Sequence, residues 1–324
     1  MKMQKKRYKG VVIGCGKIAV SHEANQGRPH PRSHAGALSL NPRTKLVAFV
    51  GKDNMDRATA ATFFPQTTFY TDAAECIEEV KPDIAIIAAP TPLHARFTTL
   101  CAEKDVPIII GEKPIASNIK DALDMLRVLA RHGTIFVLNY QRRFFPLFLR
   151  ARERLAVGTI GRIREVNCLY DNGLFNNGGH AIDTVQFLLN ERMVSATGVT
   201  NEKNATHPEG DTNIEGVVLT EKDTKISLQS FNQKISPIHE LRLYGEKGEL
   251  HIRDFGYTFD WGTEVEREEI SMTAGALNEA IHAYEDKREA VSGIQNGIET
   301  LAVLEALKES ATHGGAKTPV GVYF

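Results

Sequence analysis

The stretch that decides the fold is Tyr8-Lys9-Gly10-Val11-Val12-Ile13-Gly14-Cys15-Gly16-Lys17-Ile18-Ala19, close to the start of a chain of 324 residues. Tyr8–Ile13 predicts a short strand, and the residues after it match the pattern G-x-G-x-x-A. In this pattern the first glycine permits a tight turn, the second lets a pyrophosphate approach the backbone, and the small third residue lets a helix pack on the sheet. A helix that begins here presents free N–H groups to phosphate. The predicted dinucleotide contacts in this turn are Gly14, Gly16, Lys17 and Ile18.

Short apolar runs alternate with helical patterns through the first 140 residues. The runs that follow the first strand are 45–50 (KLVAFV), 84–88 (IAIIA), 107–110 (PIII) and 135–138 (IFVL). Runs that are nearly all apolar are typical of strands buried on both faces of a parallel sheet. Between the last two, Ser117 to Arg131 has helical spacing, with Ser117 or Asn118 as N-cap and Gly133 at the end. We predict an α/β fold with a doubly wound, Rossmann-type parallel sheet over residues 1–140.

The pattern changes after about Gln141. A helix (147–157), a strand (163–170) and a helix near 181–189 are followed by strands with little helix between them, and a last helix is predicted at 298–312. The strands of that series are 216–220, 225–231, 240–244 and 249–252. The turn between the last two is typical of a hairpin. We therefore predict a second domain over 141–324, of α+β type with a mostly antiparallel sheet.

The composition restricts the partners of the chain. Lys and Arg number 39 and Asp and Glu number 40, and this balance argues against a nucleic-acid or membrane-surface partner, which would need a basic face. Hydrophobic residues make up 42% of the chain, enough for two cores. No window is long and apolar enough to span a membrane, and the apolar run after the basic N-terminus is too short for a secretory signal. We expect a cytoplasmic protein.

The cysteines indicate neither a metal site nor disulfides. The four are far apart in the sequence and form no C-x-x-C pair. We expect free thiols and no bound metal. Their positions are Cys15, Cys76, Cys101 and Cys168.

The end of the second predicted strand bears on the choice of dinucleotide. NAD-binding sites usually have an acid here that bonds the ribose hydroxyls. This strand ends Val50-Gly51-Lys52-Asp53, so the acid position falls on Gly51 or Lys52. A cation at Lys52 suits the 2′-phosphate of NADP, although an exposed surface lysine is an equally good interpretation. Asp53 serves as the acid if the strand ends later, or else caps the next helix. The sequence thus favours NADP over NAD modestly, with Lys52 as a cofactor contact.

Two polar segments are candidates for chemistry. Glu112-Lys113-Pro114 follows the strand at 107–110, and ligands bind at the carboxyl ends of such strands. Lys113 could polarise a substrate oxygen there. In the second domain, Asn176-Asn177-Gly178-Gly179-His180-Ala181-Ile182-Asp183 opens a helix. His180 can act as an acid or base near neutral pH, and the neighbouring glycines would admit a ligand closely. A helix cap or surface group is the more ordinary role for such a histidine.

Taken in order, these motifs resemble the glucose–fructose oxidoreductase / inositol dehydrogenase (Gfo/Idh/MocA) family. The series is G-x-G-x-x-A, then Ala89-Pro90-Thr91-Pro92-Leu93-His94, then Glu112-Lys113-Pro114, then G-x-H-x-x-D, and it covers nearly the whole chain. The resemblance implies a Rossmann domain, and a C-terminal domain whose open sheet is used to form a homo-oligomer. It implies that Lys113 and His180 frame the substrate at the nicotinamide. The further cofactor contacts that it implies are Ala89, Thr91, His94 and Glu112.

One departure bears on the substrate. The family often has Asp four residues before the histidine, where this chain has Asn176, which puts inositol-type chemistry in doubt. We expect an enzyme that moves hydride between NAD(P) and a hydroxyl or keto carbon of a sugar, amino sugar or nucleotide sugar. Asn176 and Arg143 are expected to contact this small-molecule substrate, with a surface role equally open for an arginine of the 142–143 pair. The alternatives are a non-catalytic dinucleotide-binding regulator and an imine or carbonyl reductase acting on a non-sugar substrate.

Overall fold

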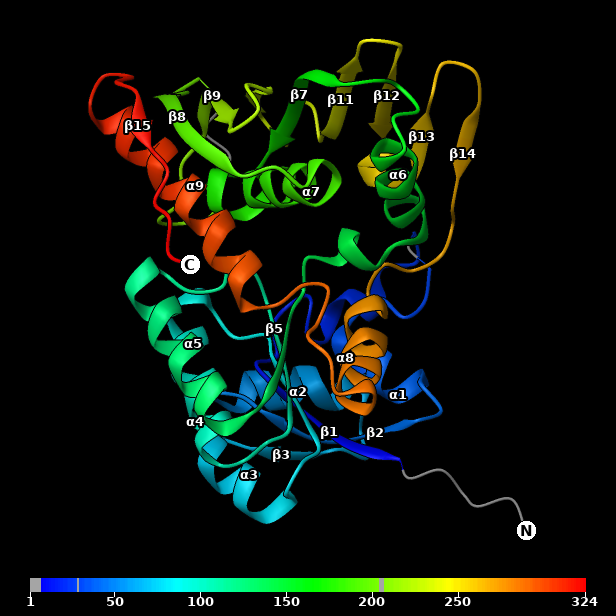
Figure 1. The fold of residues 1–324 in the computed structure, drawn as a ribbon. Helices are drawn as coiled ribbons and strands as arrows, with labels where there is room; N and C mark the ends of the chain where they lie inside the picture. The colour runs from blue at the N-terminus through cyan, green and yellow to red at the C-terminus, as the bar shows by residue number, and fades with distance from the viewer. Residues whose placement is uncertain (1–6, 28, 204–206) are drawn as a thin grey trace. The chain divides into compact units, whose positions relative to one another are not determined.

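The computed structural model describes residues 7–27, 29–203 and 207–324. The chain forms two compact units: Met1–Phe144 with Ile270–Gly297, and Phe145–Glu269 with Ile298–Phe324 (Figure 1). The first unit therefore includes a segment, Ile270–Gly297, that the sequence placed in the second domain. Among the described residues, no helix has the length and hydrophobicity needed to cross a bilayer.

The first unit is built on a six-stranded parallel sheet. Its strands lie in the order β3-β2-β1-β4-β5-β6, and every neighbouring pair is parallel. The predicted Rossmann sheet is therefore confirmed. The bounds are β1 Tyr8–Ile13, β2 Thr44–Val50, β3 Thr68–Tyr70, β4 Ile84–Ile87, β5 Ile108–Gly111 and β6 Ile135–Leu138. The sequence did not predict β3, which is a three-residue edge strand without a buried side chain.

Helices cover both faces of this sheet. One hydrophobic cluster joins side chains of α1 (His34–Leu40), α2 (Asn54–Phe63) and α8 (Gly275–Asp286) to residues of β1, β2, β4, β5 and β6. Figure 1 shows α3 (Ala73–Val80), α4 (His94–Glu103) and α5 (Ile119–His132) together on the other side of the sheet. Burial on both faces explains why the strands are almost wholly apolar in sequence.

Helix α5 shows how local sequence sets the ends of an element. The Asn118 side chain accepts a hydrogen bond from the Asp121 N–H, and Gly133 ends the helix with φ 63°. Of the two N-caps that the sequence left open, the structure uses Asn118. An N-cap bond of this kind typically contributes about 1 kcal/mol.

The second unit is built on a nine-stranded sheet in the order β14-β13-β12-β11-β7-β10-β9-β8-β15. Only the central pair β7–β10 is parallel, and the other pairs are antiparallel. The predicted α+β domain with a mostly antiparallel sheet is therefore confirmed. The strands are β7 Ile163–Asp171, β8 Met193–Thr200, β9 Ile214–Thr220, β10 Lys225–Phe231, β11 His239–Gly245, β12 Gly248–Arg253, β13 Thr258–Asp260, β14 Val265–Arg267 and β15 Thr318–Pro319.

Three helices contribute to the second unit: α6 (Pro146–Ala156), α7 (Gly179–Leu189) and α9 (Ile294–Thr312), the last from Ile298 onward. Helix α7 contacts both α6 and β7. A Cβ atom on Gly198 of β8 would lie 2.7 Å from the Leu307 carbonyl oxygen of α9, so this glycine allows close packing.

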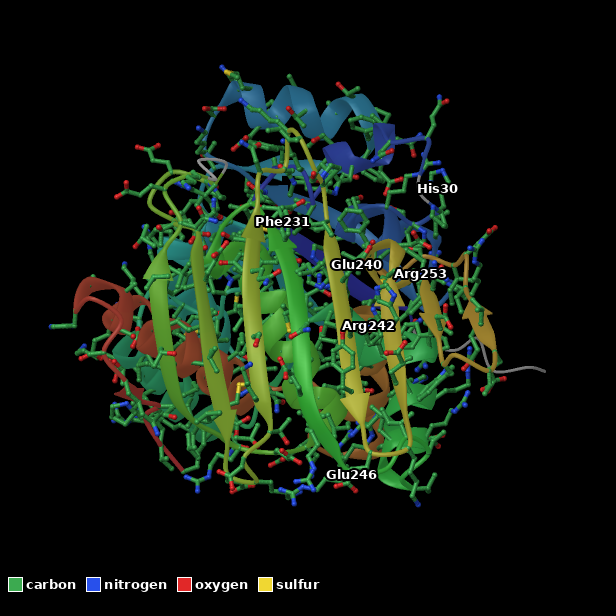
Figure 2. The ribbon with its side chains drawn as sticks, turned by 90° about the horizontal axis from the view of Figure 1, so that it is seen from above. His30, Phe231, Glu240, Arg242, Glu246 and Arg253 are labelled. Carbon is green, nitrogen blue, oxygen red and sulfur yellow. The ribbon has the colours of Figure 1, made fainter. Side chains whose placement is uncertain are left out.

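The opposite face of the sheet carries charged side chains in cross-strand pairs (Figure 2). Arg242 Nη2 lies 2.6 Å from Glu249 Oε1, and His251 Nε2 lies 3.0 Å from Glu240 Oε2. The alternation of buried and exposed residues along β10 and β11 follows from this one-sided burial.

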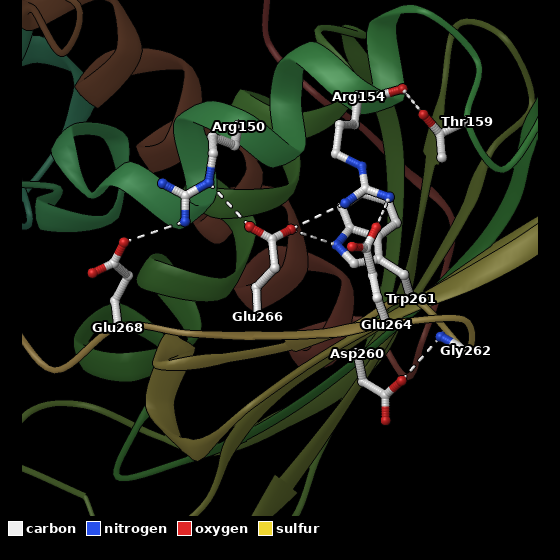
Figure 3. A network of polar contacts seen from close by, with 9 residues as sticks. All are labelled: Arg150, Arg154, Thr159, Asp260, Trp261, Gly262, Glu264, Glu266 and Glu268. Carbon is white, nitrogen blue, oxygen red and sulfur yellow. Dashed lines mark hydrogen bonds and ion pairs between the residues drawn. The ribbon is translucent and has the colours of Figure 1, made fainter.

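A polar network fixes the hairpin β13–β14 to α6 (Figure 3). Glu266 accepts hydrogen bonds from Arg150 Nε (3.0 Å), Arg154 Nη1 (3.1 Å) and Trp261 Nε1 (3.0 Å). The Arg154 guanidinium also lies over the Trp261 ring, 3.9 Å from the centroid. Charge-assisted bonds that converge on one carboxylate hold this short outer hairpin in place.

Candidate active site

The glycine turn after β1 adopts the geometry that its sequence predicts. Gly14 has φ +108°, and a Cβ there would lie 2.4 Å from the Ala88 carbonyl oxygen. Its N–H donates to the Val50 carbonyl oxygen at 2.8 Å. A Cβ on Gly16 would meet no atom within 4 Å. The first glycine is thus required by the fold, whereas the second leaves open space beside the backbone.

The segment after the glycines is not the regular helix that the motif predicted. The Val20 N–H donates to the Gly16 carbonyl oxygen at 3.0 Å, which closes a single turn. A short 3-10 helix, η1 (Ser21–Ala24), follows, and α1 begins only at His34. The helix expected to begin at the glycines therefore ends after this turn. The turn still presents its first N–H groups beside the open space at Gly16.

A cavity of about 990 Å³ lies at the carboxyl ends of the strands of the first unit. It is lined by the glycine turn, by residues after β2 and β4, and by α4. This volume is ample for a dinucleotide half. The predicted cofactor residues that line the cavity are Gly14, Gly16, Lys52 and Ala89. The predicted residues outside its lining are Lys17, Ile18, Thr91, His94 and Glu112. The cofactor contacts of both groups stay predictions.

The two glycines of the turn give a matched pair of variants. Gly14→Ala should lower the free energy of unfolding by about 1–3 kcal/mol from backbone strain alone, and the collision with Ala88 should add to this. Gly16→Ala should leave stability nearly unchanged but weaken dinucleotide binding, since the methyl group occupies the open space. Urea denaturation without cofactor and a fluorescence titration with NADH measure the two effects. Wild-type affinity in Gly16→Ala would show that no pyrophosphate approaches this residue.

The four cysteines, which the sequence predicted to be free thiols, are all buried in the structure. Cys15 lies within the glycine turn, and burial raises the pKa of its thiol to about 12. A thiol of this kind stays protonated and unreactive near neutral pH.

Glu112 lies at the centre of a buried polar cluster at the ends of β5 and β6. Its Oε1 accepts hydrogen bonds from His34 Nε2 (2.7 Å) and Asn139 Nδ2 (2.6 Å), and the Lys113 N–H lies 3.3 Å from Oε2. Burial alone would raise the pKa of Glu112, but the His34 hydrogen bond and charge, the Asn139 bond and the nearby Lys113 charge outweigh it and hold this pKa below its usual value. The cluster fixes the backbone at Lys113.

Replacing Glu112 with glutamine tests this cluster. A carboxyl whose pKa is lowered by folding contributes stability above its unfolded pKa, and this stability is lost as the pH falls through the lower folded pKa. Glu112→Gln should therefore be less stable than wild type at neutral pH, with a difference that shrinks toward acid. Urea denaturation over a pH series measures this. The control is Glu78→Gln, an exposed partner of Lys104. A pH-independent difference for Glu112→Gln would contradict the lowered pKa.

His94 connects the segment after β4 with the Glu112-Lys113-Pro114 segment. Its Nδ1 lies 2.8 Å from the Pro114 carbonyl oxygen and its Nε2 lies 2.9 Å from the Ala89 carbonyl oxygen. The side chain is 3% exposed. His94 thus positions both segments from inside the unit. Thr91 begins the short 3-10 helix η2 (Thr91–Leu93) just before it.

The second unit places His180 in the first turn of α7. A five-residue π-helical segment, η4 (Leu174–Gly178), precedes α7 and contains Asn176. The Asn176 side chain donates to the Asn172 carbonyl oxygen at 3.1 Å. A Cβ on Gly178 would lie 3.1 Å from the Leu174 side chain and 3.3 Å from that of Tyr170. Gly178 is thus small because Leu174 and Tyr170 pack against it. From the sequence this role could not be distinguished from the predicted one, in which the glycine lets a ligand approach.

Two neighbours of this helix start were not found from the sequence. The rings of His180 and His239 lie edge to face, with centroids 6.4 Å apart. Asp211 accepts hydrogen bonds from the backbone N–H groups of Phe175 (3.1 Å) and Asn176 (2.9 Å). Both residues lie far along the chain in segments without a motif, and the sheet order brings His239 of β11 next to β7. No local pattern indicates either contact.

Arg143 lies in the 3-10 helix η3 (Gln141–Phe144) of the first unit. It is 5% exposed, and its Nη1 lies 3.5 Å from the Val291 carbonyl oxygen. Arg142, beside it, is 6% exposed. The alternative that one of these two arginines is an ordinary surface residue is therefore wrong. A contact of Arg143 with substrate stays a prediction.

Two models of one protein family match the chain. Residues 8–140 match a family model described as an oxidoreductase family with an NAD-binding Rossmann fold. Residues 169–322 match the model of the C-terminal alpha/beta domain of the same family. The expected cofactor, NAD or NADP, is thereby confirmed.

Curated relatives match over part of their length. Inositol 2-dehydrogenase 1 of Saccharopolyspora erythraea is 26% identical over 194 residues, which are 56% of this chain and 56% of that protein. D-apiose dehydrogenase of Paraburkholderia graminis is 28% identical over 156 residues, which are 48% of this chain and 38% of that protein. The chain spans little more than half the length of the first relatives that it matches.

Solved structures match over nearly the whole chain. The WlbA dehydrogenase of Bordetella pertussis, in complex with NADH and UDP-GlcNAcA, has a TM-score of 0.82 at 17% identity and covers 99% of this chain and 100% of that chain. The scyllo-inositol dehydrogenase of Lactobacillus casei, with bound NAD(H) and scyllo-inositol, has a TM-score of 0.78 at 15% identity, with 97% and 99% covered. At these identities the likeness shows the fold alone.

Proposed function

Since the chain belongs to the Gfo/Idh/MocA oxidoreductase family, we propose that it is an NAD(P)-dependent dehydrogenase or reductase that acts on a sugar, amino sugar or nucleotide sugar. The observation that carries this proposal is the glycine turn at the 990 Å³ cavity, since Gly14 is held at φ +108° and Gly16 faces open space. A pyrophosphate fits beside a turn of this kind. The bound dinucleotide would supply or accept the hydride.

Lys113 is proposed to handle the proton of the reacting hydroxyl group. It follows β5, and its backbone is held by Glu112 (N···Oε2 3.3 Å) in the cluster with His34 and Asn139. A cation placed at a substrate oxygen stabilises the negative charge that develops there when the hydroxyl proton leaves. His94, bonded to the Pro114 carbonyl oxygen, keeps the next residue in place.

His180 is proposed as a second group for proton transfer, and Asn176 and Arg143 as substrate contacts. His180 is half-buried at the start of α7, next to the His239 ring. Asn176 is an amide where the family often has a carboxylate, so it can bind a substrate hydroxyl but cannot take up its proton. The named activities of relatives, on inositol and D-apiose, support a polyhydroxylated substrate.

The test is turnover with a panel of compounds. The purified chain is incubated with NAD or NADP and with polyols, aldoses, amino sugars and nucleotide sugars, and reduced nicotinamide is followed by its absorbance. The reverse reaction uses the matching keto compounds. We expect turnover with at least one polyhydroxylated compound. Dinucleotide binding without turnover of any sugar would contradict the proposal and favour a regulator or a reductase of a non-sugar substrate.

We also propose that the chain forms a homo-oligomer. The face of the second sheet that carries Arg242, Glu249 and His251 is polar and lies opposite α6, α7 and α9, and the family resemblance assigns association to this sheet. Light scattering measures the assembly.

A further inference from the structure

The end of β2 lacks the acidic residue that is usual at this position of an NAD-binding Rossmann domain. Rossmann domains that bind NAD usually have an acid at this position, which accepts hydrogen bonds from the adenosine ribose. Here the position is held by Gly51, which is buried and has no side chain. The next residue is a lysine, and from the sequence this pair favours NADP.

The structure shows what occupies the space beside Gly51. A Cβ on this residue would lie 2.7 Å from the Asp56 Cβ, 3.0 Å from Asp56 Oδ2 and 2.7 Å from the Phe69 ring. Asp56 belongs to the first turn of α2, five residues further along the chain. Its side chain therefore fills the place where a side chain at the end of β2 would begin, and only glycine at position 51 leaves room for it.

The Asp56 carboxylate is held in place and has one oxygen available. Its Oδ2 accepts a hydrogen bond from the Lys52 N–H at 2.8 Å. Its Oδ1 accepts no hydrogen bond from any residue that the structure describes, and Asp56 lines the 990 Å³ cavity. Asp53 has a different task, since it caps α2 by accepting from the Met55 and Asp56 N–H groups.

The charges around this point do not suit an additional phosphate. Lys52 Nζ lies 3.8 Å from Asp53 Oδ2, and the Lys52 side chain is 81% exposed. Two cations line the cavity, Lys52 and Arg96. The acidic residues that line it are Asp56, Asp72, Glu103, Asp121 and Asp124.

We propose that Asp56 binds the hydroxyl groups of the adenosine ribose and makes the site selective for NAD(H) over NADP(H). This inference rests on the proposed dinucleotide-dependent function and assigns the residue that chooses the cofactor. A ribose 2′-hydroxyl donates a hydrogen bond to a carboxylate, whereas a 2′-phosphate has only acceptors and is repelled by it. The selectivity inferred from Lys52 in the sequence is thereby reversed.

The experiment measures affinities for NADH and NADPH separately, by nicotinamide fluorescence, in the full chain and three variants. Wild type should bind NADH at least about tenfold more tightly than NADPH. Asp56→Asn, which keeps an oxygen for the Lys52 N–H, should lose most of this ratio. Lys52→Ala should leave the ratio nearly unchanged. Asp124→Asn is the matched control, because it removes one negative charge from another part of the cavity and should also leave the ratio unchanged.

The outcomes separate this inference from the proposed function. Two outcomes would overturn the role of Asp56 and leave the proposed function standing. In the first, the chain turns over a sugar but binds NADH and NADPH equally well. In the second, it turns over a sugar and prefers NADPH, and Lys52→Ala abolishes this preference. An equal shift in Asp56→Asn and Asp124→Asn would overturn the specific contact in favour of general charge. Binding of neither dinucleotide would overturn both. Thermal unfolding of each variant checks that it is folded. If Asp56→Asn does not fold, the ratio of the wild-type affinities for NADH and NADPH still tests the predicted selectivity.

Discussion

Replacement of Lys113 by alanine is expected to lower turnover by roughly 100- to 10,000-fold while changing dinucleotide affinity little, as is typical when a group for acid–base catalysis is lost. Lys113 lies directly after Glu112, whose buried contacts with His34 and Asn139 fix the backbone at this point. Removing the side chain takes away one positive charge near Glu112 but leaves the hydrogen bonds of Glu112 with His34 and Asn139 in place. Steady-state kinetics with one working substrate, together with a fluorescence titration of NADH, separate the two effects.

Two further variants sharpen this result. Lys120→Ala removes an exposed lysine of α5 that pairs with Asp124, and it should behave as wild type. Lys113→Arg keeps a positive charge but cannot release a proton near neutral pH. Partial activity in Lys113→Arg would indicate that charge alone is needed, whereas loss as large as in the alanine variant would indicate proton transfer. Near-normal turnover in Lys113→Ala would exclude the proposed role.

The second large effect is expected at His180. His180→Ala should cost most of the oxidation rate, again roughly 100- to 10,000-fold. In wild type the rate should rise with pH as the imidazole becomes neutral and able to accept a proton. Asn176→Asp adds a negative charge four residues before His180, which favours the protonated imidazole, so this rise should move to higher pH. The measurement is a pH–rate profile of the three proteins with one substrate.

A control and a contrary outcome complete this test. His313→Ala changes an exposed histidine of the second unit and should reproduce the wild-type profile. If Asn176→Asp has an unchanged profile, then residues 176 and 180 do not act on the same proton. The assignment of Asn176 to the substrate would then be wrong, although the loss in His180→Ala would still stand by itself.

Local sequence was sufficient where a single segment sets the geometry. The strands β1 and β6 occur with the predicted bounds, because apolar runs bounded by turns have few other ways to be buried. Gly14 was assigned to a tight turn from its motif, and the structure gives it φ +108°. Asn118 and Gly133 end α5 by contacts within a few residues.

Sequence failed where the partner comes from a distant segment. Asn139 and His34 meet Glu112 only because β5 and β6 are neighbours and α1 begins beside the glycine turn. Asp56 reaches the end of β2 because Gly51 has no side chain and leaves space for it. The order of glycines and acids in the sequence does not indicate which side chain fills that space. Short strands such as β3 escaped prediction since their pairing comes from neighbours on the sheet.

Because helix α8 belongs to the first unit, the two units do not correspond to two continuous stretches of sequence. Its residues Ala276, Leu277, Ala280 and Ile281 belong to the same hydrophobic cluster as Ile110 and Val137 of the first sheet. A fragment that stops at residue 140 would therefore expose this apolar surface to water and is expected to aggregate. The chain passes from one unit to the other at 144–145, 269–270 and 297–298. To exchange the first unit between two relatives, two separate segments, 1–144 and 270–297, must be exchanged together. Recombination at a single point would divide this unit, so the chain is expected to be inherited as a whole.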